Sequence, residues 1–399
     1  MVTYVALLML LQLGTAPAEA TLCSALLFIP WVLKPIMRPW VRRVGHFRQM
    51  LHLIDALLFV SLLLLAFSFN PSPVQLSTLN FQLSTFLALL LVSLLCAWHE
   101  LTARMHYERM LRPSLQRLLA APKFACSQVV LIFTYGALIF FVGMLQVYFR
   151  QIRYSWSLGC YVAAGLFLLF SLSLSFCRRG GNRLRLNESH REDQPCRVPL
   201  PGRDRGMLLL LLFLLLLPQG LMFHARVLYL YAMHAQGGLQ CTMQEIGFAQ
   251  GTVGVIAFSL GLALGRRFIR HYSLPRLFWP MALSLVLSPF VYLGMTIRPP
   301  ESLWMLCCCT MTAQLLFGFG LSVCRLPISA MSGTCYRNTT NMLQIPYVSA
   351  ALFVPMAVSG CLVEYLGFST YFLINALTAP ACLLGVYLLR KHLSCIISS

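Results

Sequence analysis

Seven polar side chains inside long apolar stretches are the candidates for chemistry. The candidates for binding a solute are Arg226, His224, Gln219 and Gln250, and the candidates for gating or proton transfer are Glu100, His99 and Asp55. An ionisable group inside a membrane-spanning segment costs free energy and usually marks a functional position. Because a guanidinium group pairs with a carboxylate or phosphate through parallel hydrogen bonds, Arg226 is the candidate for holding an anionic solute.

The charged candidates also have structural interpretations. Arg226 could instead bind an acid or a carbonyl group and lock two helices together. Glu100 precedes Arg104 by four residues, a spacing that favours a local ion pair on a helix. Asp55 could form a salt bridge with the basic stretch 38–48, or latch a gate there.

Further polar residues lie in or beside the apolar stretches. Glu19 and Glu245 stand where helices are expected to begin, and the helix dipole stabilises a carboxylate there, so we expect both to cap their helices. The uncharged residues that could line a hydrophilic path, besides Gln219 and Gln250, are Gln236, Gln314, Asn341, Gln344 and Asn375.

Common motifs of nucleotide-dependent and hydrolytic enzymes are missing from the sequence. It has no Walker loop, no G-x-S-x-G elbow and no H-E-x-x-H motif. Most of the 15 cysteines lie in apolar stretches, where a thiol behaves as a small apolar side chain, and none forms a C-x-x-C pair. We therefore expect no catalytic residues, no cofactor and no metal site. Because no ATP site is present, a transporter with this sequence would have to run on an ion gradient or on solute flux.

The composition is that of a membrane domain. The chain is 59% hydrophobic and only 10% charged, whereas a soluble protein carries roughly a quarter charged residues. The net charge of +19 could suggest nucleic acid as a partner. The arginines, however, stand in short clusters between apolar stretches, which is the positive-inside pattern of membrane proteins, so we expect a lipid bilayer and no nucleic acid.

Twelve apolar stretches are candidates for membrane spans, and all but the first reach the length of about twenty residues that a span needs. They are Val2–Gly14, Ala18–Met37, Met50–Phe69, Phe81–Ala103, Phe124–Tyr148, Trp156–Phe176, Met207–Met233, Gln244–Leu264, Arg276–Ile297, Ser302–Cys324, Asn341–Leu362 and Gly367–Leu389.

The distribution of Lys and Arg predicts the orientation. If the loops after the even-numbered spans face the cytoplasm together with the C-terminus, they hold all Lys and Arg residues except Arg150, Arg153, Arg298 and Arg226. This bias predicts a multi-pass protein of the cell inner (cytoplasmic) membrane, with both termini in the cytoplasm.

The chain divides into two halves of six spans. The polar, basic stretch 177–206 predicts a cytoplasmic linker between an N-terminal bundle, residues 1–176, and a C-terminal bundle, residues 207–399. The halves also carry a degenerate repeat in the same orientation. The marks occur in the same order in both halves: Gln12-Leu13-Gly14 corresponds to Gln236-Gly237-Gly238, Glu19 to Glu245, and Arg42-Arg43 to Arg266-Arg267. Of the two glycines in the second half, Gly237 is the one aligned with Gly14. This repeat predicts an all-α polytopic fold of two six-helix bundles.

The short first stretch has two interpretations. Val2–Leu13 followed by Ala-Pro-Ala-Glu-Ala resembles a signal peptide, but it lacks a basic beginning. The repeat places Met1 opposite His224, well inside the matching helix. We therefore expect a truncated first helix.

Two segments carry a resemblance to a known family. They are Ala18-Glu19-Ala20 followed by the stretch 26–35 (LLFIPWVLKP), and Gln244-Glu245-Ile246-Gly247 followed by Gly251-Thr252-Val253-Gly254. They resemble the second-helix entry, and its counterpart in the second half, of the peptide/acetyl-CoA/drug transporter branch of the major facilitator superfamily, which includes the AmpG-like muropeptide permeases. The resemblance implies the major facilitator fold, a central cavity between two bundles, and proton-driven import of muropeptide.

The chain departs from that family in two places. The Glu-Gly-Leu-Pro-Tyr type of first-helix opening is absent, and His99-Glu100 stands where the family tends to have Gln-Asp.

The sequence predicts a monomeric secondary transporter that moves a polar, anionic small-molecule solute, such as a cell-wall fragment, by ion-coupled alternating access. One alternative is a non-transporting relic or sensor of the same fold. Another is a membrane enzyme acting on a lipid-linked substrate, for which His99-Glu100 with His106 and Glu108 would be the nearest cluster.

Overall fold

The computed structural model describes residues 2–44, 46–69, 78–111, 113–180, 202–272, 274–324 and 338–398. Every regular element in these residues is helical. Most of the predicted linker 177–206 lies outside the described residues, as do Arg325 and Arg337 of the predicted inner loops, and the side chains of Asn341 and Gln344 are not described.

The N-terminal half comprises the helices up to Gly180. They are α1 (Val2–Gln12), α2 (Pro17–Leu26), α3 (Ile29–Val32), α4 (Lys34–Val44), α5 (Phe47–Ser68), α6 (Thr78–Met110), α7 (Pro113–Leu118), α8 (Ala120–Ile132), the π-helix η1 (Phe133–Ala137), α9 (Leu138–Phe149) and α10 (Ile152–Gly180). Proline at the start of α2 has no N–H to lose from the helix ladder and fixes φ, so it suits this position.

The C-terminal half begins at Gly202. Its helices are α11 (Gly202–Tyr231), η3 (His234–Gln236), α12 (Met243–Ile246), the π-helix η4 (Gly247–Val253), α13 (Gly254–His271), α14 (Leu274–Ile297), α15 (Leu303–Leu321), η5 (Ser322–Cys324), α17 (Asn338–Leu366), α18 (Phe368–Leu377) and α19 (Ala379–Ser398). Several of these helices continue through a proline, which neighbouring groups make tolerable inside a membrane bundle. Asn375 of α18 donates to the carbonyl of Pro218 at 3.3 Å and so ties α18 to α11.

The described helices agree with the predicted spans. Ten are long and apolar enough to cross a bilayer, and the bent pair Pro17–Val32 and Lys34–Val44, which meets at 46°, makes an eleventh if it is one span. The first predicted span is the short apolar helix α1, Val2–Gln12. Ten of the predicted full-length spans are therefore confirmed, and the predicted second span is the bent pair.

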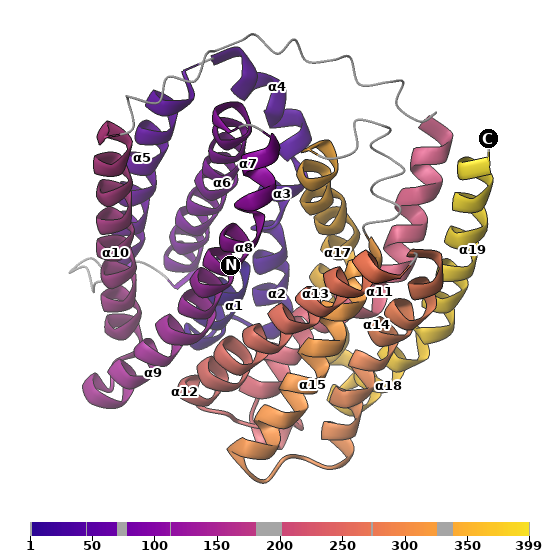
Figure 1. The fold of residues 1–399 in the computed structure, drawn as a ribbon. Helices are drawn as coiled ribbons and strands as arrows, with labels where there is room; N and C mark the ends of the chain where they lie inside the picture. Colours follow the sequence, from indigo (N-terminus) through magenta and orange to yellow (C-terminus); the bar gives the residue numbers. More distant parts are fainter. Residues whose placement is uncertain are drawn as a thin grey trace.

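The two halves stand beside one another in Figure 1, with the indigo-to-magenta helices α1–α10 on one side and the pink-to-yellow helices α11–α19 on the other. We call the end at which α10 finishes and α11 starts the linker end, and the opposite end the far end. Two pairs of elements make the main contacts between the halves: α2 with α17, and η1–α9 with α12–η4. Exchanging the halves converts one pair into the other, because spans 2 and 11 correspond to spans 8 and 5.

The repeated glycines adopt the same conformation. Gly14 follows α1 with a φ of +85°, and Gly237 follows η3 with a φ of +78°. Both values lie in the left-handed region that glycine occupies without a steric penalty. The alignment of Gly14 with Gly237, made from sequence, therefore matches two turns of one kind at the far end.

Glycine also permits the closest approach between the halves. A Cβ atom on Gly251 of η4 would collide with the carbonyl group of Tyr135 in η1, and one on Gly136 would collide with Thr252. The two π-helices thus face each other backbone to backbone. A Cβ atom on Gly247 would likewise collide with the backbone of Phe140 in α9.

Helix α1 lies in the core despite its short length. Eight of its residues are buried, and it contacts α2 and α6 of its own half as well as α11 of the other. Its uniformly apolar sequence suits this position, since every face of the helix meets protein.

Candidate solute site between the two halves

Arg226 of α11 is the charged residue at the centre of the candidate site. Its Nε atom is buried and donates to no described acceptor, and its guanidinium lies over the Phe223 ring, 5.1 Å from the centroid. Within the part of the chain that the structure describes, no carboxylate forms an ion pair with Arg226. The helix-locking ion pair considered from the sequence is therefore not found there.

Three tyrosines lie near the guanidinium. Arg226 lies close enough to Tyr4, Tyr135 and Tyr292 to act electrostatically on each hydroxyl group. Tyr4 of α1 and Tyr135 of η1 come from the N-terminal half, and their rings meet edge to face at 4.7 Å. Tyr292 comes from α14 of the C-terminal half. Arg226 thus faces residues of both halves.

Two glutamines extend the site on the C-terminal side. The Tyr292 hydroxyl donates to the Gln250 Oε1 atom at 3.4 Å, and Gln314 of α15 lies within hydrogen-bonding reach of the same hydroxyl. The Nε2 atom of Gln250 is buried and has no described partner. Gln250 therefore retains a free amide donor, because its carbonyl oxygen is occupied by Tyr292.

The predicted binding residues His224 and Gln219 do not gather with Arg226 in the same way. His224 is two residues from Arg226, so it projects from another side of α11, and it lies beside Phe223 and the backbone of Met356 in α17. The Gln219 Nε2 atom donates to the Leu285 carbonyl at 2.7 Å and so ties α11 to α14. Of the four predicted binding residues, Arg226 and Gln250 come together around Tyr292.

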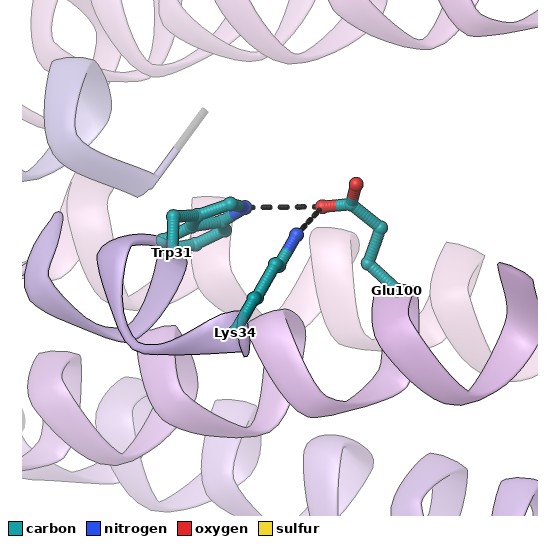
Figure 2. Close-up of polar contacts among 3 residues, drawn as sticks. All are labelled: Trp31, Lys34 and Glu100. Carbon is teal, nitrogen blue, oxygen red and sulfur yellow. Dashed lines mark hydrogen bonds and ion pairs between the residues drawn. The ribbon is translucent and has the colours of Figure 1, made fainter. Parts of the chain in front are cut away.

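Glu100 forms a half-buried ion pair close to the linker end. Its Oε2 atom accepts from the Lys34 Nζ atom at 2.5 Å and from the Trp31 Nε1 atom at 3.0 Å, as Figure 2 shows. The Lys34 side chain is 6% exposed, whereas that of Glu100 is 40% exposed. Arg104, the partner expected from the sequence, acts on Glu100 electrostatically. The ion pair with Lys34 joins α4 to α6.

Asp55 and His99 form a second polar contact, and His99 directly precedes Glu100 in α6. The His99 Nε2 atom lies 3.0 Å from Asp55 Oδ1, and the Ser171 hydroxyl donates to Asp55 Oδ2 at 3.0 Å. These contacts connect α5, α6 and α10 of the N-terminal half. The structure therefore brings two of the three predicted gating residues into direct contact.

The two predicted capping residues behave differently. Glu245 forms a capping box with Thr242 at the start of α12, so its predicted role is confirmed. Glu19 lies in the first turn of α2 but makes no capping hydrogen bond there. The carboxylate that accepts from this helix start belongs to Glu364 of α17, whose Oε1 atom lies 3.0 Å from the Ala18 nitrogen.

Sequence reasoning missed the aromatic part of the site. Tyr4, Tyr135 and Tyr292 stand in apolar stretches where tyrosine is common, and no spacing links them. Only the positions of α1, η1 and α14 bring them together. Among the described residues, no group of three or more His, Cys, Asp or Glu residues is placed to hold a metal ion.

Comparison with known proteins identifies the fold. No protein-family model and no curated protein matches the chain. It is similar to the inward-open structure of the xylose transporter XylE from E. coli, with a TM-score of 0.64 and 14% identity, covering 96% of this chain and 91% of that one. For the structure of a D-xylose-proton symporter, the TM-score is 0.64 and the identity 12%, covering 96% and 92%.

A variant of the nucleoside transporter NupG is similar over 98% of this chain and 94% of that one, with a TM-score of 0.63 and 13% identity. Identities this low concern the fold alone. The chain has the all-helical fold of the major facilitator transporters, as predicted from its sequence.

Proposed function

We propose that this protein is a secondary transporter that moves an anionic solute between the two sides of a membrane by alternating access. The observation that carries the proposal is the guanidinium of Arg226, which lies between the halves and pairs with no described carboxylate. An unpaired charge inside a membrane bundle is costly, and such positions are kept for substrates or ions. The similar structures include xylose and nucleoside transporters, which supports transport in general.

The contacts between the halves suit a rocking motion. They are concentrated in two pairs of elements, α2 with α17 and η1–α9 with α12–η4, and both pairs pack closely through glycine. Small residues allow helices to slide and tilt past one another without large side chains interlocking. In this proposal the bundles pivot on these pairs, and Arg226 is exposed to one side of the membrane at a time.

The proposed orientation in the membrane and the proposed proton coupling are both argued from charged residues. The excess of Lys and Arg near the linker end favours a cytoplasmic linker in a cell inner membrane. The Asp55–His99 contact and the Lys34–Glu100 pair are candidates for a coupled proton, since each joins separate helices through an ionisable group. A muropeptide is one candidate cargo, suggested by the sequence resemblance alone, and a monomer is the expected state.

Transport can be tested with the purified protein in proteoliposomes. We expect gradient-dependent uptake of an anionic solute from a panel that includes anhydro-muropeptide, and loss of that uptake in Arg226→Ala. Arg298→Ala is the matched control, because it removes the same charge from an exposed position at the far end. Asp55→Asn should abolish the dependence on a proton gradient while leaving exchange across equal concentrations.

Two outcomes would contradict the proposal. One is no uptake of any solute in the panel by a correctly folded protein, which would favour a non-transporting sensor of the same fold. The other is equal uptake by the protein and by Arg226→Ala, which would remove Arg226 from the solute path.

A further inference from the structure

The buried polar atoms around Arg226 form a set that lacks acceptors. They include the Tyr4 hydroxyl, the Arg226 Nε atom and the Gln250 Nε2 atom, and none has a described hydrogen-bond partner. The two ring nitrogens of His224, on another side of α11, are also buried without one. Tyr4 and Gln250 are 4% and 5% exposed. A buried donor without a partner costs about 1–3 kcal/mol. Three such groups at one place indicate that a ligand with acceptor oxygens completes the site.

The charge of the site limits the charge of that ligand. Among the described residues, the one fully charged group that acts on Tyr4, Tyr135 and Tyr292 is Arg226. Glu100 and Asp55 lie in contacts elsewhere, with Lys34 and His99 respectively. One negative charge neutralises the guanidinium, whereas a second would remain unpaired in a region of low dielectric constant, which is strongly unfavourable.

The shape of the site limits the group that carries the charge. Phe223 lies against the guanidinium, and the edge-to-face pair Tyr4–Tyr135 stands on the opposite half. Aromatic walls suit a flat, largely apolar body, because such rings pack on its faces. A planar carboxylate matches the planar guanidinium through two parallel hydrogen bonds.

Building on the proposed function, we infer that the site takes an organic solute with a single carboxylate and a flat apolar body, and that it discriminates against phosphate dianions. The carboxylate binds to Arg226 and Gln250 of the C-terminal half. The flat apolar body of the solute and a second acceptor atom on it contact Tyr4 and Tyr135 of the N-terminal half. A ligand of this kind contacts both halves at once and so draws them together.

The inference is tested by thermal stabilisation of the full-length protein in detergent at pH 8, using four probes at equal concentration. Benzoate has the charge and the flat body, acetate has only the charge, benzamide has only the body, and phenylphosphate has the body with two charges. We expect benzoate to raise Tm by several degrees and each of the other three to have a much smaller effect.

Variants separate the contacts. Arg226→Gln should abolish the benzoate shift, and Tyr4→Phe, which removes one hydroxyl, should weaken benzoate binding by about fivefold to tenfold, the usual contribution of one hydrogen bond. Arg298→Gln is the control for a lost positive charge and should leave the shift unchanged. Circular dichroism of each variant confirms that it is folded before its Tm is compared.

Each result decides between the inference and the broader proposal. Phenylphosphate could raise Tm more than benzoate does, with that shift lost in Arg226→Gln. This result would contradict the inferred preference for a monocarboxylate but would still support an anion transporter. Equal shifts with benzamide and benzoate would overturn the anion site itself. No shift with any probe would overturn the inferred solute class, and the uptake assay in proteoliposomes would then judge transport independently.

Discussion

The Glu364 carboxylate of α17 accepts a hydrogen bond from the backbone N–H of Ala18, 3.0 Å away in the first turn of α2. This bond crosses from one half to the other at the far end. One turn earlier, Gly360 lies so close to Thr21 that no Cβ atom would fit. A carboxylate is well suited to the start of a helix, where free N–H groups and the helix dipole attract it. In the proposed rocking motion, opening of the far end would break this contact.

Removing that carboxylate should loosen the far end. We expect Glu364→Ala to lower stability by about 1 kcal/mol, the usual cost of a lost helix cap. The measurement is the apparent Tm in detergent. Glu19→Ala is the matched control, because Glu19 lies in the same helical turn and makes no capping hydrogen bond. Equal losses in the two variants would show that the hydrogen bond from Ala18 contributes nothing.

The close crossing of η1 and η4 gives a second prediction. Gly251→Ala places a methyl group against the carbonyl of Tyr135, so the π-helices must separate. We expect a loss of about 1–3 kcal/mol, typical of overpacking, and a reduced rate of uptake. Gly294→Ala in α14 meets nothing within 4 Å and should be neutral or slightly stabilising. A tolerated Gly251→Ala would contradict the backbone contact.

The Lys34–Glu100 pair should respond asymmetrically to mutation. Glu100→Gln leaves the buried Lys34 ammonium without its counter-ion, and we expect a loss of about 3 kcal/mol. Lys34→Met leaves a carboxylate that is 40% exposed, which water can solvate, so the loss should be smaller, about 1 kcal/mol.

The double variant Lys34→Met/Glu100→Gln removes both charges and should recover most of the stability lost in Glu100→Gln. Thermal unfolding of the four proteins completes the cycle. Additive losses would mean that the two charges do not stabilise each other, despite the contact drawn in Figure 2.

Helix α1 is held at the far end by amide contacts. The Gln12 Oε1 atom accepts from Trp156 Nε1 and from Gln146 Nε2, each at 2.7 Å. Gln12→Leu would leave the N–H of a fully buried tryptophan without an acceptor, so we expect a loss of about 1–3 kcal/mol. Gln12→Glu keeps the acceptor for Trp156 and should cost less. Tryptophan fluorescence and Tm together report both effects.

Much of the fold was predictable because bilayers impose simple rules. Apolar length located the spans, including the short α1, since backbone polar groups must be satisfied within helices inside a membrane. The alignment of Gly14 with Gly237 coincides with equivalent turns in the structure, because a left-handed residue after a helix favours glycine. The capping role of Glu245 followed from the same local chemistry.

The candidate site was only partly predictable. Arg226 and Gln250 could be singled out because a charged or amide side chain is conspicuous among leucines. Gln219 looked equivalent, but it satisfies the Leu285 carbonyl, a partner 66 residues away. Glu100 looked like the partner of Arg104, yet its ion pair is with Lys34 from another helix.

The sequence by itself determined the class of the molecule, the number and order of its spans, and the position of a lone intramembrane arginine, since these depend on local composition and on the cost of exposing polar groups to lipid. Only the tertiary structure decided which side chains meet: Tyr4 and Tyr135 opposite Arg226, Glu364 at the start of α2, and Gly251 against Tyr135. Contacts between distant helices depend on how the bundles pack, and the periodicity of a single helix carries no record of its neighbour.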